Sequence, residues 1–477
     1  MTTWHIVGLV VTLVVIVALS LYSGRKVKSA ADFATGGGKT GAAIVAGAIM
    51  GTLVGGSSTV GTAELAYNYG LSAWWFTLGG GIACLILAIG FVHKFKISGQ
   101  STLVSIVSKE YGSTAGMLSS VLSSVGIFIN IISQLLAALA VIAVVAPRLG
   151  TIPALAISAV LMAMYVIFGG VKAAGLVGVV KLVLLYVAMI GGGLIVLHLT
   201  GGLTPLLDGI HGVEAAEGNK VNFLSLFARG AGKDIGAGVS LILGVLTTQS
   251  YAQAVIAGRN DKQSRIGALA SAVLIPPIGA GGILIGMYMR VHAAEYAGLG
   301  AKTALTEFIM HHMPPLLGGV VLATLLIAVV GTGAGLSLGI STILNNDIVK
   351  KVTRKFDEPK KNLLISRVFI IAVLVLACVM SEVLGHEAIL SFAFMSMGLR
   401  GSVIFMPMVL ALWAPRRVDS KFIIVSVVIS PLCVLLFGIP PLNGAITFDS
   451  LFIGMAVSVV ICLLGLAVGK GKRALGN

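Results

Sequence analysis

The stretch GAIMGTLVGGSSTVGTAEL, residues 47–65, places the sequence Gly-Gly-Ser-Ser-Thr in the middle of an apolar run. An apolar run of about 20 residues crosses a membrane as a helix, but flexible and polar residues at its centre predict that this helix is interrupted. Unwound backbone at membrane depth is tolerated only where it is buried in protein or lines a cavity. The stretch therefore predicts an internal site in a membrane protein.

A second segment of the same kind is GVSLILGVLTTQSYAQAVIAG, residues 238–258, which carries Thr247, Thr248 and Gln249 at its centre. One alternative is that both segments are packing seams, since small residues often line helix interfaces in membranes. We favour two broken helices, because the segments are the second and seventh apolar runs and therefore occupy corresponding positions of two inverted five-helix repeats. Paired broken helices of this kind mark the binding site of a transporter.

The composition excludes a soluble globular domain. Hydrophobic residues make up 57% and charged residues 10% of the chain, and the mean hydropathy is +1.05. The net charge of +15 does not indicate nucleic-acid binding, because the basic residues are scattered in short loops between apolar runs. The cysteines all fall within apolar runs and are predicted to be packing residues. They are Cys84, Cys378, Cys433 and Cys462.

The chain is predicted to be an all-α polytopic membrane protein with about thirteen transmembrane helices. We expect the first run to be a retained helix, since no convincing cleavage site follows it. The runs are 4–23, 41–66, 71–93, 115–147, 151–169, 173–199, 235–257, 266–289, 315–345, 363–384, 388–414, 421–439 and 446–469.

The loops between these runs predict the orientation. Basic residues concentrate in alternate loops, from Arg25 and Lys26 in the first to Lys470 and Arg473 in the tail, with Arg148 as the main exception. Cytoplasmic loops carry such an excess of lysine and arginine. We therefore predict a multi-pass protein of the plasma membrane with its N-terminus outside and its C-terminus in the cytoplasm.

Four further strings carry a family resemblance: SGRKVKSAADFATGGG (23–38), GTAELAYNYGLSAWW (61–75), TTQSYAQAVIAGRNDKQSRIGAL (247–269) and STILNNDIVKK (341–351). In this order and spacing they resemble the sodium/solute symporter family, which includes sodium-coupled sugar, proline, pantothenate and sialic acid carriers. The resemblance implies a LeuT-type inverted repeat and alternating access. The single transporter domain, 1–477, would then comprise an extra first span (4–23), repeats at 41–199 and 235–414, and two final spans (421–469).

The resemblance also implies a sodium site between the first and eighth core helices. On this sequence the site would be formed by the carbonyls of Gly51 and Val54 with Ala328, Gly331 and Thr332. A hard cation binds several oxygens, and backbone carbonyls freed by unwinding supply them. The family usually has hydroxyls at the last two positions, whereas Gly331 has no side-chain oxygen.

Lys181 in GGVKAAGLVGVVK (169–181) departs further from the family pattern. The family has a Trp-Thr-Asp-like triplet here and often a glutamine three residues later, whereas this chain has Val177 and Gly178, with Lys181 at the glutamine position. We expect the Lys181 ammonium to replace sodium or compete with it, and its cyclic deprotonation to couple transport to protons. Two alternatives are a permanent structural charge and a peripheral lysine that snorkels to the surface while sodium couples transport.

Other intramembrane polar groups are candidates for binding the solute. Arg400 suits a carboxylate or other oxyanion, or alternatively joins a helix break at Gly398 and Gly401. Glu64 could carry a proton or act as a counter-ion, but we favour an interfacial carboxylate. The remaining candidates lie at the broken helices and on the third core helix, where the alternative is helix–helix hydrogen bonding. They are Gly55, Gly56, Ser57, Ser58, Asn130, Ser133, Gln134, Thr247, Thr248 and Gln249.

The predicted function is therefore a secondary active transporter, a cation-coupled symporter of a small organic solute, for which a carboxylate is one candidate. A membrane-embedded enzyme would need convergent His, Asp or Glu residues in the spans, and a transporter-like sensor would need a signalling partner. We expect no enzymatic activity, no cofactor and no metal site except one for Na⁺, with Na⁺ or H⁺ as the coupling ion. His311 and His312 are interpreted as the entry to a helix. The expected partners are the solute and the lipid bilayer but no nucleic acid, and the chain is expected to be a monomer or a loose oligomer.

Overall fold

The computed structural model describes residues 2–24, 40–167, 170–296, 300–349, 359–384, 388–438, 442 and 446–474. Parts of the predicted loop at 23–38 and of the string at 341–351 lie outside these ranges. Every element of secondary structure in the described ranges is helical, apart from one isolated bridge between Thr40 and Gly258.

Most helices of the first half of the chain coincide with predicted apolar runs, and two of these runs contain short π or 3₁₀ turns (η). The elements of this half are α1 (Thr3–Gly24), α3 (Ala42–Leu53), η2 (Ser57–Gly61), α4 (Thr62–Tyr69), η3 (Gly70–Trp74), α5 (Trp75–Ile86), η4 (Leu87–Phe91), α6 (Val92–Ser98), α7 (Leu103–Tyr111), α8 (Ser113–Val145), α9 (Thr151–Ile167), α10 (Gly170–Thr200) and α11 (Leu203–Ala216).

The second half of the chain also consists of long apolar helices joined by shorter elements. They are α12 (Ala231–Thr247), α13 (Gln249–Ala257), α14 (Asp261–Val291), α15 (Ala304–His312), α16 (Pro315–Ile343), η7 (Leu344–Val349), α18 (Pro359–Leu384), α19 (Ile389–Trp413), α20 (Ser420–Gly438) and α21 (Leu451–Ala474). Local signals explain several starts: Asn260 caps α14 by accepting a bond from the Gln263 N–H, and Pro315 is at the start of α16.

Among the described residues, nine helical segments are long and apolar enough to cross a membrane, or ten if the bent pair α12–α13 is one span. The shorter apolar helices Thr3–Ile16, Ala42–Leu53 and Thr151–Val166 coincide with further predicted runs. The all-α polytopic class is confirmed and is compatible with about thirteen spans, a number that stays a prediction.

Both predicted helix breaks are confirmed. The first segment stops being α-helical at Leu53, passes through Val54, Gly55 and Gly56, and resumes as η2 and α4. The second bends by 50° between α12 and α13, at Thr248. In both cases the sequence offers glycine or hydroxyl residues at the point where backbone bonds of a regular helix are lost.

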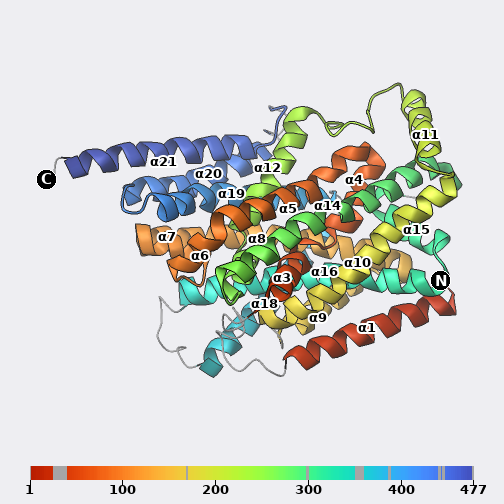
Figure 1. Cartoon of the computed structure of the whole chain (residues 1–477), viewed down its shortest axis with the longest axis horizontal. Helices are drawn as coiled ribbons and strands as arrows, with labels where there is room; N and C mark the ends of the chain where they lie inside the picture. Colours follow the sequence, from red (N-terminus) through yellow and green to blue (C-terminus); the bar gives the residue numbers. More distant parts are fainter. Residues whose placement is uncertain are drawn as a thin grey trace.

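Packing places the two breaks in the interior of the bundle. Helix α10 packs against α3, α14 and α16, while α19 packs against α8 and α12. Figure 1 shows α1 along one edge of the bundle and α20 and α21 along the opposite edge. Helix α16 lies between α1, α8 and α10, and residues from Val321 to Ile343 of this helix are buried.

Candidate functional site

The Lys181 ammonium lies at the first helix break, where the resemblance implies a sodium ion. Its Nζ donates to the Gly51 carbonyl at 2.7 Å, to the Ala328 carbonyl at 2.9 Å and to Thr332 Oγ1 at 3.3 Å. The side chain is 1% exposed. Three oxygen acceptors match the three N–H donors of an ammonium, so Lys181 does not snorkel to the surface. The carbonyl of Val54 makes no hydrogen bond to Lys181.

Gly178 and Gly331 explain how a lysine fits here. A Cβ at Gly178 would overlap the Gly47 carbonyl and lie 3.3 Å from the Gly51 Cα, so glycine lets α10 approach α3 closely. A Cβ at Gly331 would lie 3.6 Å from Lys181 Nζ. The backbone of α3 therefore fills the space at Gly178, while a side chain at Gly331 would face the Tyr165 hydroxyl, 3.3 Å from its Cβ, as well as the lysine.

The first break is fixed by the third core helix, α8. Gln134 Oε1 accepts from the Gly56 N–H at 2.8 Å, and Gln134 Nε2 donates to Ser57 Oγ at 2.8 Å and to Asn130 Oδ1 at 3.3 Å. The Ser57 and Ser133 hydroxyls are 3.0 Å apart. The structure therefore brings the predicted residues of η2 and α8 into one hydrogen-bonded group.

Within the break, the hydroxyl of Ser58 replaces lost helix bonds. Ser58 Oγ accepts from the Gly55 N–H at 2.9 Å and donates to the Leu53 carbonyl at 3.1 Å. A Cβ at Gly55 would collide with the side chains of Thr332 and Gln134. Glycine is required here because two helices approach the unwound backbone.

The second break brings together Thr248 and Arg400. Arg400 Nη1 donates to Thr248 Oγ1 at 2.6 Å, Nε donates to the Ser396 carbonyl at 3.1 Å, and Nη2 lies 2.8 Å from Met397 Sδ. Arg400 is completely buried. Because α19 is one continuous helix, the alternative in which Arg400 joins a break at Gly398 and Gly401 is wrong.

The other two candidates of this segment point elsewhere. Thr247 Oγ1 donates to the Leu243 carbonyl at 2.7 Å. A threonine hydroxyl inside a helix commonly bonds in this way to the carbonyl four residues earlier. Gln249 accepts from the Leu103 N–H at 2.9 Å and donates to the Ser101 carbonyl at 3.1 Å. Gln249 therefore holds the start of α7.

The Glu64 side chain is buried within the protein, and its expected position at the membrane interface stays a prediction. It is 5% exposed, and its Oε2 accepts from the Ile389 N–H at 3.1 Å, at the first residue of α19. Ser133 Oγ donates to the Ile389 carbonyl at 2.8 Å. Ile389 was missed from sequence because its backbone, not its side chain, makes these contacts.

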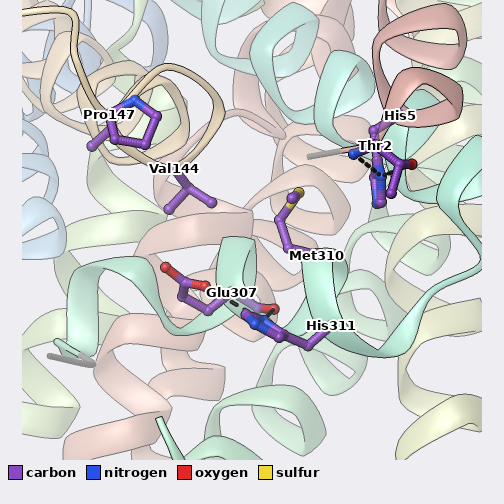
Figure 2. A pocket seen from close by; sticks show the side chains of 8 residues that line it. Thr2, His5, Val144, Pro147, Glu307, Met310 and His311 are labelled. Atoms are coloured by element: carbon purple, nitrogen blue, oxygen red, sulfur yellow. Dashed lines mark hydrogen bonds and ion pairs between the residues drawn. The ribbon is translucent and has the colours of Figure 1, made fainter. Parts of the chain in front are cut away.

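One cavity, of 520 Å³, lies away from both breaks. It is lined by Thr2, His5, Ala143, Val144, Pro147, Glu307, Met310 and His311. Figure 2 shows His5 and His311 on separate elements, with Met310 between them. Among the described residues, no group of three or more His, Cys, Asp or Glu side chains is arranged to hold a metal ion.

Comparisons with known proteins agree with this architecture. The structure is similar to that of a Na⁺-coupled sialic acid symporter in a substrate-bound outward-open state, with a TM-score of 0.80 and 16% identity over 98% of each chain. It is also similar to Mhp1, a nucleobase-cation-symport-1 family transporter, with a TM-score of 0.55 and 12% identity over 91% of this chain and 93% of that one. These likenesses support the LeuT-type fold.

No curated protein sequence matches the chain. A model of the sodium:solute symporter family matches residues 33–422, which is most of the chain and includes both broken helices, Lys181 and Arg400. This match and the two structural likenesses concern transporters and not enzymes. The chain belongs to the sodium:solute symporter family.

Proposed function

We propose that this symporter couples the movement of a small organic solute to protons, and that the Lys181 ammonium takes the place of sodium. The observation that carries the proposal is the contact of Lys181 Nζ with Gly51, Ala328 and Thr332. A sodium ion at this point would bind the same oxygens, so the ammonium and the ion exclude each other.

The physical argument is one of charge. Removing an ammonium from water costs several kcal/mol, and hydrogen bonds to a charged group each return about 1.5–3 kcal/mol. The described residues provide Lys181 with neutral oxygens and no carboxylate, so loss of its proton leaves no unpaired anion behind. The contacts join the broken helix α3 to α10 and α16, and a neutral amine would hold them more weakly.

A transport cycle follows from this arrangement. The protonated lysine stabilises the contact of α3 with α16, and release of the proton on one side of the membrane weakens it. Protonation from the other side restores it, so a proton gradient drives the change of access. The solute occupies the hydrogen-bonded groups around Gly55, Gln134 and Thr248, and its movement is coupled because it binds the same broken helices.

The test is uptake into proteoliposomes of a solute found first by a thermal-shift screen. We expect an imposed proton gradient to drive accumulation and a sodium gradient alone to drive none. Lys181→Met should abolish proton-driven accumulation, whereas Lys233→Met, at an exposed lysine of α12, should not. Full accumulation on a sodium gradient, or proton-driven uptake by Lys181→Met, contradicts the proposal. A permanently charged Lys181 predicts that neither gradient drives accumulation.

The orientation with the N-terminus outside, the plasma-membrane location and a monomeric or loosely oligomeric state are part of the same proposal. The loop charges described above support the orientation. Labelling of single cysteines introduced at Lys233 and Arg259 with a membrane-impermeant reagent tests the orientation, because the predicted topology puts these two positions on opposite sides.

A further inference from the structure

Two buried cations lie at the two helix breaks, one in each predicted repeat. Lys181 is on α10, the fifth core helix, and contacts the broken segment at α3 and the helix α16. Arg400 is on α19, the tenth core helix, and contacts the broken segment at Thr248. It also lies against α8, since a Cβ at Gly126 would stand 2.5 Å from Arg400 Cγ.

The inverted repeat relates these two positions. It relates the first, third and fifth core helices to the sixth, eighth and tenth. Lys181, on the fifth, lies against the first and the eighth, and Arg400, on the tenth, lies against the sixth and the third, so their surroundings correspond.

The two cations differ in how far their donors are satisfied. An ammonium has three N–H donors, and Lys181 has three oxygen acceptors. A guanidinium has five N–H donors, while Arg400 bonds to one carbonyl, one hydroxyl and one thioether sulfur, which is a weak acceptor. Arg400 forms no ion pair with any carboxylate in the part of the chain that the structure describes.

The surroundings of Arg400 connect it to the first break. Gly126 lies one helical turn along α8 from Asn130, which bonds to Gln134 and through it to Ser57. On the same side of α8, Ser123 and Ser119 are buried with hydroxyls that bond to no described residue. The guanidinium thus lies beside a polar strip of α8 that continues in one direction to Asn130 and Gln134 at the first break and in the other to Ser123 and Ser119.

We infer that Arg400 and Thr248 form an oxyanion subsite that binds the carboxylate of the solute, while Lys181 serves coupling and contacts no solute. This inference rests on the proposed function and names its substrate class. The two unused N–H groups of Arg400 suit a carboxylate, because a planar guanidinium binds two oxygens in parallel. Arginine keeps its charge throughout the cycle, as a permanent binding group requires, whereas a coupling group must lose its proton.

The experiment measures binding in detergent, without any gradient, so it is independent of proton coupling. The probes are matched pairs of carboxylates and neutral amides: acetate and acetamide, lactate and lactamide, benzoate and benzamide. We expect at least one carboxylate to raise the melting temperature of the wild type while its amide does not. Arg400→Gln should weaken the apparent affinity for that carboxylate at least tenfold, and Arg400→Lys should weaken it less.

The matched control is Arg290→Gln, because Arg290 pairs with Glu217 and lies over the Tyr67 ring, away from both breaks. It should leave carboxylate binding unchanged. If Arg400→Gln does not yield a monodisperse protein, Arg400→Lys decides the question, since it keeps the charge but not the planar fork. The inference is overturned if no carboxylate stabilises the wild type more than its amide, or if the folded Arg400 variants bind it as the wild type does. Failure of proton-driven uptake with intact carboxylate binding would instead reject the Lys181 proposal alone.

Discussion

Gly178 of α10 lies directly against Gly47 of α3, so that a Cβ on Gly178 would overlap the Gly47 carbonyl oxygen. This close approach brings α10 near enough for Lys181, one turn further along, to reach the Gly51 carbonyl at 2.7 Å. The glycine at the position of the family's aspartate therefore does more than remove a carboxylate. It sets the distance between the two helices that the ammonium joins.

Gly178→Ala should destabilise the protein by about 1–3 kcal/mol, the usual cost of inserting a methyl group into a well-packed interface. Gly178→Asp should be worse, because the added carboxylate must also be buried. The measurement is the melting temperature of the purified protein. Gly191→Ala in the same helix is the control: its Cβ meets nothing within 4 Å, so this change should be neutral or slightly stabilising. Equal melting temperatures for the two alanine variants would contradict this prediction, because they would show that α10 and α3 accommodate the added methyl group without loss of stability.

A sodium site should appear when the lysine is removed and a hydroxyl is supplied. In Lys181→Gln/Gly331→Ser, the Gly51 and Ala328 carbonyls lose their ammonium and Thr332 gains a second hydroxyl beside it, which are the oxygens a hard cation needs. We expect NaCl, but not choline chloride, to raise the melting temperature of this double variant. The wild type and Gly331→Ser alone should not respond, because the ammonium still occupies the oxygens. A sodium response of the wild type would contradict the exclusion of sodium by Lys181.

The residue types at the centres of two apolar runs predicted both helix breaks, and the family resemblance implied the site at which Lys181 meets Gly51, Ala328 and Thr332. The sequence did not predict the approach of α10 to α3, although the glycines at 47 and 51 form a G-x-x-x-G pair, a common sign of close helix packing. It placed Gln249 in the solute site, whereas the structure turns it toward α7. The direction of a side chain on a bent helix depends on the bend, which residue types do not specify.

Glu64 holds the start of α19 through one contact. Its carboxylate accepts from the Ile389 N–H, where unsatisfied helix donors favour a negative group, while Ser133 binds the Ile389 carbonyl. Glu64→Ala should therefore leave a buried N–H unpaired, at a cost of about 1–3 kcal/mol, and loosen the first turn of α19. Hydrogen exchange followed by mass spectrometry should show faster exchange of peptides that begin at Ala388. Glu382→Ala, at an exposed position of α18, should not change the exchange of these peptides. Unchanged exchange in Glu64→Ala would show that other contacts hold the first turn of α19.

The histidines outside the spans predict a response to pH. Desolvation lowers the pKa of His312 below its ordinary value of 6.5, with smaller contributions from His311 and His292, against an opposing contribution of Glu295. In the fold, His312 Nε2 lies 2.5 Å from the Tyr296 hydroxyl. A lowered pKa means that the unfolded segment takes up a proton more readily than the folded one. The stabilisation is therefore present above about pH 6.5 and is lost as the pH falls through the lowered pKa of the folded state.

Helix α15, which ends at His312, should consequently open more readily in acid. We expect hydrogen exchange of peptides from residues 304–312 to accelerate between pH 7.5 and pH 5.5, after correction for the intrinsic exchange rate. His312→Gln should remove most of this acceleration, because the amide side chain does not titrate. His211→Gln, on α11 beside Glu214, should leave the acceleration intact. If His312→Gln responds to acid as the wild type does, the proton that opens α15 binds elsewhere.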